Sequence, residues 1–272
     1  MIVDVFRELN RDVLSLVKRA YMADPPVRYA YLYYDITYYP EFTEAYLNVV
    51  GNNIIGYLLI FRGLPYTAIH VIGNAPLNAL SEALLNNHLV IHAETEPKHV
   101  NYLINRLSSR GAVSLSRGGL TMICWSNCFR EFVIHGNVTV RRLSIKDIDE
   151  FLRIKNIQGT RISKAEALIR LSSPHWHYYG LFTNNELVAI AGTYLKLPEV
   201  WIIGDVFTAP NYRNRGFAKA VVSAVTKDVI NAGAMAILHV DENNTPAIKV
   251  YERLGYIAVQ YFIWLHYEKR SS

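Results

Sequence analysis

Cysteine is scarce in this chain of 272 residues, where only Cys124 and Cys128 occur. Their Cys-x-x-x-Cys spacing has no second pair of ligands nearby, which argues against zinc, and two thiols make no disulfide framework. We expect both to be buried and reduced. No apolar run approaches the roughly 18 residues of a membrane span, and no basic stretch precedes an apolar core at the N-terminus, as in a signal peptide. The expected localisation is cytoplasmic, with no membrane partner.

Long clusters of Lys and Arg are also missing. The net charge is +5, but residues 1–136 carry 11 basic and 11 acidic side chains, whereas residues 137–272 carry 17 and 12. This density is too low for a nucleic-acid-binding domain, so no nucleic-acid partner is expected. The positive excess in the second half suits a small anionic ligand with several phosphates.

The second half contains a turn with the composition of a phosphate site, within residues 206–218 (VFTAPNYRNRGFA). An apolar run of strand length precedes it, and apolar residues at helical spacing follow it. The turn carries Arg213, Gly216 and Ala218 in the pattern Arg-x-x-Gly-x-Ala. A helix start offers unpaired N–H groups and the positive end of the dipole, and glycine lets a ligand approach the backbone. Together with the cations of Arg213 and Arg215, this predicts a pyrophosphate cradle.

A second motif follows in residues 237–256, where a strand leads to Asn244 and then to a helix that carries Tyr251 and ends at Gly255. The two motifs, in this order and spacing, resemble the GNAT superfamily of N-acetyltransferases. The resemblance covers roughly residues 138–268. It implies acetyl-CoA (coenzyme A) as co-substrate, with no metal.

The resemblance also implies which residues bind the cofactor. The backbone of residues 206–208 would bind the pantetheine arm like an added strand, and the N–H groups of residues 214–219 would face the pyrophosphate. Asn244 either caps the helix that follows it or contacts the cofactor. The predicted cofactor-binding residues are Val206, Phe207, Thr208, Arg213, Asn214, Arg215, Gly216, Phe217, Ala218, Lys219, Asn244 and Tyr251.

The predicted catalytic residue is Tyr251. Its apolar neighbours at helical spacing make core packing one interpretation of this side chain. The resemblance implies the other, a general acid that protonates the departing thiolate, since a phenol stays protonated at neutral pH. A backbone N–H of Thr208 or Phe207 would then stabilise the oxyanion.

A general base is harder to find. In the superfamily, the strand before the phosphate turn splays away from its neighbour and often carries a Glu or His that acts as base. The corresponding positions here are Ile202 and Gly204, and neither residue can accept a proton. Asp205 is close, but strand alternation points it to the other face. A bulge would bring Asp205 back, and deprotonation through water is the alternative.

Hydrophobic periodicity and turn signals predict the elements of both halves. In the first half we expect helices over residues 4–22, 77–87 and 97–109, and strands over 29–39, 45–50, 54–61, 66–72, 89–93 and 120–125. In the second half we expect helices over residues 148–157, 164–171, 217–229 and 245–254, and strands over 138–143, 178–183, 187–196, 200–208 and 261–267.

The order of strands and helices in the first half repeats that of residues 200–267. Residues 73–76 stand where the phosphate turn would be but lack its pattern. We therefore expect an α/β (α+β) protein with tandem GNAT-like units, each a mixed, mostly antiparallel sheet flanked by helices. The predicted domains are a degenerate unit over 1–135 and a catalytic unit over 136–272. This layout resembles the glycine N-acyltransferase group.

The predicted function is transfer of an acetyl or acyl group from acetyl-CoA to a primary amine by direct attack. The acceptor would be a small molecule or a peptide. The alternative is a non-catalytic acyl-CoA-binding or interaction module on the same fold, which the missing base favours and the phosphate turn and Tyr251 disfavour.

Overall fold

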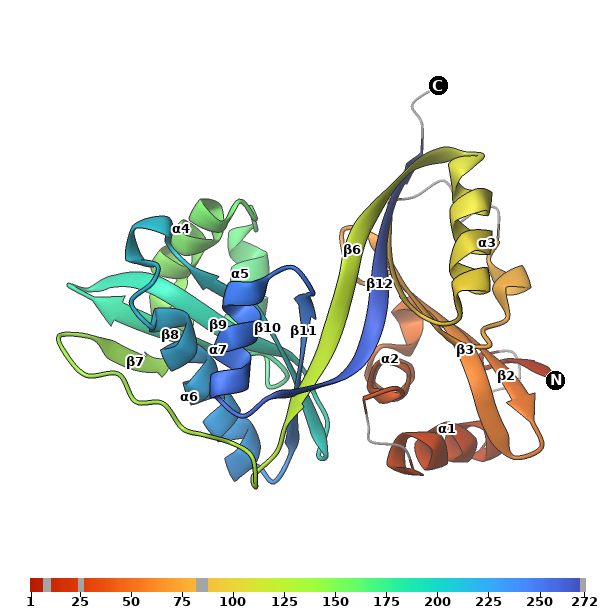
Figure 1. Cartoon of the computed structure of the whole chain (residues 1–272), viewed down its shortest axis with the longest axis horizontal. Coiled ribbons are helices and arrows are strands. Elements are labelled where there is room, and N and C mark those ends of the chain that lie inside the picture. Colours follow the sequence, from red (N-terminus) through yellow and green to blue (C-terminus); the bar gives the residue numbers. More distant parts are fainter. Residues whose placement is uncertain (7–10, 24–26, 82–87, 270–272) are drawn as a thin grey trace. The chain divides into compact units, whose positions relative to one another are not determined.

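The computed structural model describes residues 1–6, 11–23, 27–81 and 88–269, and the chain divides into two compact units (Figure 1). Unit 1 comprises Met1–Leu120, Asp241–Asn243 and Gln260–Ser272; unit 2 comprises Thr121–Val240 and Asn244–Val259. This division differs from the single boundary expected between residues 135 and 136. The reason is that the C-terminal end of the chain returns to unit 1 as a strand.

Unit 1 is a sheet with helices of its own. Its strands lie in the order β1-β2-β3-β4-β5-β12-β6. Their bounds are β1 Ile2–Asp4, β2 Thr43–Val50, β3 Asn53–Phe61, β4 Thr67–Gly73, β5 Leu89–Glu94, β6 Gly111–Cys124 and β12 Ile257–Lys269, of which β6 and β12 extend into unit 2. The helices are α1 Arg11–Ala23, α2 Ala30–Tyr38 and α3 Pro97–Ser108, with 3₁₀ helices Pro40–Phe42 and Leu77–Ala79.

Unit 2 follows the same pattern of a sheet with helices. Its strands lie in the order β11-β10-β9-β8-β7. Their bounds are β7 Thr139–Arg142, β8 His177–Thr183, β9 Glu186–Lys196, β10 Val200–Thr208 and β11 Met235–Asp241. The helices are α4 Ile148–Gln158, α5 Lys164–Ser172, α6 Phe217–Asn231 and α7 Thr245–Arg253, with 3₁₀ helices Ile145–Asp147 and Pro210–Tyr212.

Antiparallel pairing dominates in both units. Only β4 with β5 and β10 with β11 are parallel among the strand pairs with a described register. In each unit, therefore, a strand, a connection and a parallel strand follow each other, as the repeated order predicted. The expected fold class, mixed and mostly antiparallel sheets flanked by helices, is confirmed.

The elements around the phosphate turn match their predicted ranges closely. Ser144 and Asp147 form a capping box before α4, and Gly159, in the left-handed region, ends that helix. On the inner side of α4 and α5, a buried cluster packs Phe151 and Ile154 against Tyr178 of β8. These apolar contacts hold α4 against the unit 2 sheet.

One predicted helix of unit 1 is wrong at its start, and a second lies largely outside the described residues. The helix expected over residues 4–22 begins later, since residues 2–4 form β1 and the described helix begins at Arg11; residues 7–10 lie outside the described range. Val3 is buried and pairs with Leu47 of β2, a long-range contact that periodicity does not reveal. The helix expected over 77–87 is described only as the 3₁₀ helix Leu77–Ala79, because residues 82–87 also lie outside the described range.

The aromatic run at residues 29–39 is a helix, α2, and not the predicted strand. Tyr34 and Tyr38, one helical turn apart, bring their ring centroids to 5.1 Å, and Tyr31 packs against His70 of β4 at 4.3 Å. Tyrosine favours strands only where a pleated surface packs against it. Here contacts along the helix and with the sheet outweigh that preference.

Strand β6 begins well before the predicted 120–125, and β12 extends beyond 261–267 at both ends. Glycines hid the longer strand, since they weaken strand propensity. A Cβ added at Gly118 would lie 1.8 Å from the Tyr261 hydroxyl, and one at Gly119 would lie 2.3 Å from the Phe262 ring. These glycines therefore make room for aromatic rings.

Both cysteines are free, and their Sγ atoms lie 3.6 Å apart. Cys124 is buried as expected, but Cys128 is partly exposed, contrary to expectation. Cys128 lies in a turn after β6, where its N–H donates to Trp125 O.

Candidate active site

The turn between β10 and α6 forms an open cradle of backbone. Asn214 and Gly216 both adopt the left-handed conformation, with φ of 61° and 80°, and α6 begins at Phe217. The first N–H with a helical partner is that of Ala220, which donates to Gly216 O. The N–H groups of residues 217–219 precede that bond and have no acceptor within the helix, an arrangement that favours an anion.

A cavity of about 740 Å³ opens beside this turn. It lies wholly within unit 2 and is lined by β10, the turn, the start of α6 and one face of α7. Among the predicted site residues, all but Arg215 line it: Val206, Phe207, Thr208, Arg213, Asn214, Gly216, Phe217, Ala218, Lys219, Asn244 and Tyr251. Arg215 instead places its guanidinium 5.5 Å from the centre of the Tyr212 ring.

The two parallel strands beside the cavity separate, as the resemblance implied. Pairing of β10 with β11 runs from Val200↔Met235 to Ile203↔Leu238, although β10 continues to Thr208. Residues 206–208 therefore keep only the β9 side of their ladder and offer the other side to the cavity. Thr208 lines the cavity, and its hydroxyl is buried with no hydrogen-bond partner among the described residues.

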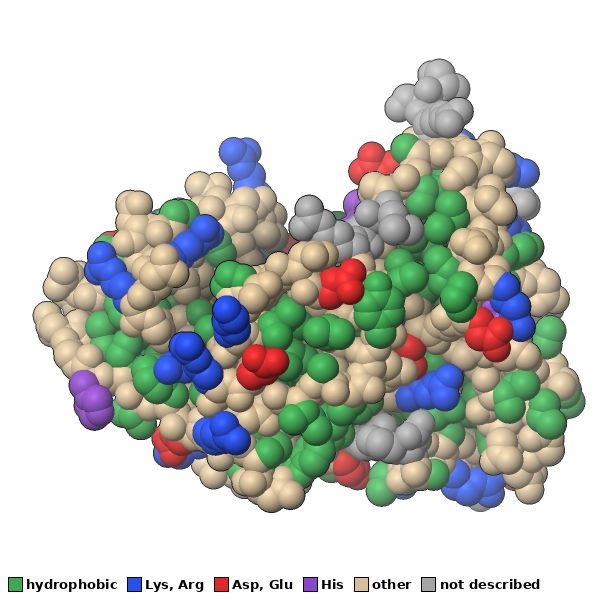
Figure 2. Space-filling model, in the orientation of Figure 1, with side chains coloured by type: hydrophobic (Ala, Val, Ile, Leu, Met, Phe, Trp, Pro, Cys, Tyr) green, Lys and Arg blue, Asp and Glu red, His purple; other side chains and the backbone are tan. Residues whose placement is uncertain are grey.

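Cations surround the mouth of this cavity. Arg213 donates from Nε to Thr208 O at 3.3 Å, and Lys219 places Nζ 3.5 Å above the Phe132 ring. Several Lys and Arg side chains lie over the region of α6 and α7 in the space-filling view (Figure 2). The positive end of the α6 dipole adds to their field, so the site favours a polyanion.

Helix α7 contributes wall residues that sequence reasoning missed. Lys249 and Arg253, one turn apart on α7, line the cavity together with Pro246, Ala247 and Val250. The signal was present in the spacing of these residues, which places them on one face of a helix. Asn244 caps α7, since its Oδ1 accepts from the Ala247 N–H at 3.3 Å, and it also lines the cavity.

Tyr251 lies in the cavity wall. Its side chain is 6% exposed, and burial raises its pKa to about 12. The phenol is therefore protonated throughout the neutral range, as a proton donor must be. Its ring packs 6.0 Å from that of Tyr256, whose hydroxyl lies 2.7 Å from Thr226 Oγ1.

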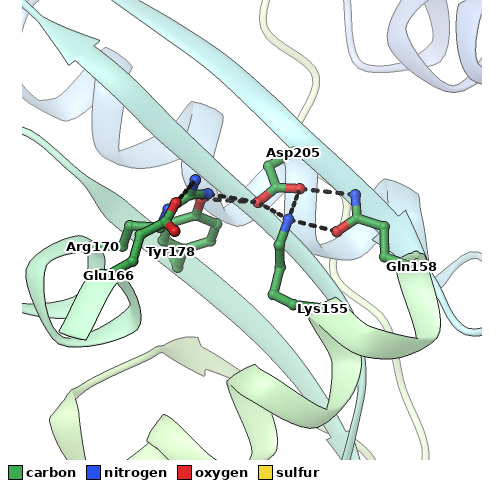
Figure 3. Close-up of polar contacts among 6 residues, drawn as sticks. All are labelled: Lys155, Gln158, Glu166, Arg170, Tyr178 and Asp205. Atoms are coloured by element: carbon green, nitrogen blue, oxygen red, sulfur yellow. Dashed lines mark hydrogen bonds and ion pairs between the residues drawn. The ribbon is translucent and has the colours of Figure 1, made fainter. Parts of the chain in front are cut away.

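A bulge at Asp205, one of the two possibilities that the sequence offered for a base, is present, and Asp205 has a φ of 53°. Its carboxylate nevertheless forms its contacts on the side of β10 away from the cavity. Lys155 Nζ lies 2.8 Å from both oxygens, and the Tyr178 hydroxyl donates at 2.9 Å (Figure 3). Burial alone would raise the Asp205 pKa, but the Lys155 charge and the donated hydrogen bonds outweigh it and hold the pKa below its ordinary value. This carboxylate is thus a structural anion and a poor proton acceptor.

The part of the chain that the structure describes holds no group of three or more His, Cys, Asp or Glu side chains arranged for a metal ion. Within the same residues, no helix is both long and apolar enough to cross a membrane.

Comparison with known sequences supports the site region. Residues 178–265 match the family model described as FR47-like protein. A stretch of 68 residues is 38% identical to the mycothiol acetyltransferase of Corynebacterium aurimucosum. That match covers 24% of this chain and 21% of the relative, so it spans about a fifth of the relative's length.

Solved structures resemble the whole chain. A Drosophila protein shares a TM-score of 0.74 at 12% identity, with 99% of each chain covered. A tandem GNAT protein from the clavulanic acid biosynthesis pathway shares 0.60 at 11% identity, covering 100% of this chain and 99% of that one. A putative GNAT-family acetyltransferase from Novosphingobium aromaticivorans shares 0.55 at 21% identity, with coverages of 83% and 92%. The chain thus has the fold of a tandem GNAT protein, with an FR47-like segment over residues 178–265.

Proposed function

We propose that this protein is an acetyl-CoA-dependent acyltransferase that acetylates a primary amine by direct attack. One observation carries the proposal: a single cavity joins a free strand edge, a helix start with unused N–H groups, and a buried phenol. These three parts match, in turn, the pantetheine arm, the pyrophosphate and the thioester of acetyl-CoA.

The residues present fit this co-substrate. A Cβ added at Gly216 would have the Phe132 ring, 3.7 Å away, as its nearest neighbour, so there is room for an anion against the backbone. Arg213 and Lys219 supply positive charge beside that space.

The bound co-substrate supplies an acetyl group activated as a thioester. The chain's own groups would handle the charges and protons of the transfer. The backbone N–H of Thr208, which points away from β9, donates to the carbonyl oxygen as it becomes negative. As the new C–N bond forms and the C–S bond breaks, Tyr251 Oη gives its proton to the leaving sulfur. The amine's own proton passes to water, since Ile202 and Gly204 hold no base.

The layout of the chain suggests which primary amines to test as acyl acceptors. Two GNAT-like units in tandem resemble the glycine N-acyltransferase group, so small amino acids head the list of primary amines to test, followed by peptides. Release of free thiol from acetyl-CoA, measured for each amine, tests the proposal. Thiol release with none of them, in a protein that binds acetyl-CoA, would refute catalysis.

A second candidate function is a non-catalytic acyl-CoA-binding module. The engagement of Asp205 with Lys155 favours it, because no described carboxylate or imidazole at the expected base positions serves the cavity. Calorimetric binding of acetyl-CoA without turnover on the whole panel would be its signature.

A further inference from the structure

We propose that Asp205 is a positioning residue: its ion pair with Lys155 holds the β10 bulge that directs residues 206–208 into the cavity. The inference rests on the proposed function, since it assigns a role in binding the pantetheine arm. It concerns side chains outside the cavity wall, because neither residue lines the cavity.

The bulge sets which side of β10 faces the cavity. Gly204 pairs with Gly192 and Phe207 with Ile190, so two residues, Asp205 and its successor, stand opposite a single residue of β9. An extra residue shifts the alternation of every side chain that follows it. Without the bulge, residues 206–208 would present their opposite faces and a different set of backbone groups.

The left-handed conformation at this position does not itself require a carboxylate. Glycine is the usual residue at the left-handed position of such a bulge, and Asp and Asn tolerate it better than other side chains. A carboxylate here must also be desolvated, which is costly unless it is paired. The choice of Asp therefore points to a role for the side chain.

That role is visible in the contacts of the carboxylate (Figure 3). Lys155 is 3% exposed and Asp205 16% exposed in their side chains, with 2.8 Å between Nζ and Oδ1. Gln158 Nε2 donates to Oδ1 at 2.9 Å, and Tyr178 Oη donates to Oδ2 at 2.9 Å. The Arg170 guanidinium lies 3.9 Å from Oδ2. These partners come from α4, α5 and β8.

The elements that hold Asp205 are packed into the core of unit 2. Tyr178 belongs to the buried cluster in which Phe151 and Ile154 of α4 pack on the sheet. Lys155 and Gln158 lie in the last turn of α4, just before Gly159 ends it. One carboxylate thus connects the strand beside the cavity to the packed end of α4. Loss of the pair would leave the bulge permitted but no longer fixed.

The test distinguishes binding of the pantetheine arm of coenzyme A from binding of its phosphates. The double variant Lys155→Met/Asp205→Gly removes both charges together and keeps a residue that accepts the left-handed conformation. Calorimetry measures its affinity for coenzyme A and for adenosine diphosphate, which carries a pyrophosphate but no pantetheine arm. We expect coenzyme A to bind about tenfold more weakly, the equivalent of one or two lost hydrogen bonds, with the affinity for adenosine diphosphate unchanged.

The matched control is Arg141→Met/Asp147→Asn, which removes another paired carboxylate of unit 2, from β7 and the start of α4. It should leave both affinities at the parent values, because this pair joins β7 to the start of α4 and does not involve the β10 bulge. If the first double variant does not fold, the double variant Lys155→Gln/Asp205→Asn, whose side chains are close in volume to the originals, replaces it. We expect its affinity for coenzyme A to fall by at least about threefold relative to its affinity for adenosine diphosphate.

Four results are decisive. A selective loss of coenzyme A affinity supports the positioning role. A folded Asp205 double variant that matches a parent binding both ligands, or one that weakens both equally, overturns this inference and leaves the proposed function in place. A parent that binds neither ligand overturns the proposed function and this inference with it.

Discussion

In both units a glycine in the left-handed region lies between a strand and the element that follows it, at the end of β4 in unit 1 and at the start of α6 in unit 2, but only one of the two turns is open. In unit 1 a Cβ added at Gly73 would lie 2.6 Å from Ile55 O and 2.8 Å from Arg28 Nη2. In unit 2 a Cβ added at Gly216 would find its nearest atom 3.7 Å away, in the Phe132 ring. The same backbone conformation is filled by protein in the first unit and open to a ligand in the second.

The polar groups of the two turns differ in the same way. In unit 1 the Asn74 N–H donates to Ile55 O at 3.0 Å, and Thr95 Oγ1 donates to Gly73 O at 2.6 Å. Asn48 Nδ2 donates to Asn74 O at 3.0 Å. In unit 2 the first N–H groups of α6 still face the cavity. A repeated fold therefore repeats the path of the chain, whereas an anion site also requires unused donors and space.

The sharpest way to break this difference is to close the open turn. Gly216→Glu places a side chain with negative charge where the anion would bind and strains the left-handed backbone. We expect binding of acetyl-CoA to fall below detection in calorimetry, a loss of at least about 100-fold. The parent should bind one cofactor per chain, because the unit 1 turn is filled.

Helix α6 offers a matched control at its other end. Gly233 also has a positive φ, 76°, and open space around it. Gly233→Glu should therefore carry a similar backbone strain and the same charge but leave acetyl-CoA binding intact. Equal affinities for the two variants, or two cofactors per parent chain, would contradict the contrast between the turns.

The next largest effect is expected at Tyr251. Tyr251→Phe keeps the ring in the cavity wall and removes the proton, so turnover should drop by about 10²–10⁴-fold, the usual worth of general acid catalysis. Acetyl-CoA affinity should change little. Steady-state thiol release and calorimetry on the same preparation measure the two quantities.

Tyr256→Phe is the control, since Tyr256 packs beside Tyr251 but does not line the cavity. It loses the contact with Thr226 Oγ1, so its melting temperature should fall while its turnover stays near that of the parent. A Tyr251→Phe enzyme within about threefold of the parent rate would assign this ring to core packing.

The sequence predicted unit 2 better than unit 1 for a physical reason. In unit 2 the caps, turns and helical spacing agree with each other, as at Ser144 before α4 and Gly216 before α6. In unit 1 the local signals conflict with distant contacts, as in α2, where the tyrosines favour strand locally but pack as a helix against β4. Local pattern cannot report such contacts.

The site shows the same limit. The cavity wall from Val206 to Lys219 was predictable, because a contiguous motif places it. The pair of Lys155 and Asp205 was not, because the two residues meet only after α4 packs on the sheet. The sequence raised a bulge at Asp205 as one possibility, but no local pattern names the partner that holds it.

The two units should also respond to pH in opposite directions. In unit 1, burial raises the pKa of Asp35 to about 7, so the folded state holds this proton more tightly than the unfolded chain. The contribution of Asp35 to the free energy of unfolding is therefore fully present below about pH 4 and is lost as the pH rises towards 7. In unit 2, hydrogen bonds from Arg141 lower the pKa of Asp147 to about 2, so stability is present above about pH 4 and is lost as pH falls towards 2.

Two substitutions test these signs. Asp35→Asn removes the buried charge and should stabilise the protein at pH 8 by about 2–4 kcal/mol, with less gain at pH 5. Asp147→Asn weakens the pair with Arg141 and the capping box, so it should destabilise at pH 8 by about 1–2 kcal/mol. Urea unfolding at both pH values measures the changes. A loss of stability in Asp35→Asn at pH 8 would contradict the assigned direction.

The smallest effect is expected at Thr208. Thr208→Val keeps the branched shape and removes a buried hydroxyl that lacks a protein partner among the described residues, so the free protein should not lose stability. Acetyl-CoA affinity should fall by about three- to tenfold if a ligand satisfies that hydroxyl. Thr226→Val should behave in the reverse manner, because its hydroxyl bonds Val222 O at 2.8 Å and Tyr256 Oη at 2.7 Å. Its melting temperature should fall with affinity unchanged. Calorimetry and thermal melts on both variants distinguish a ligand contact from a core hydroxyl, and unchanged affinity in Thr208→Val would exclude the contact.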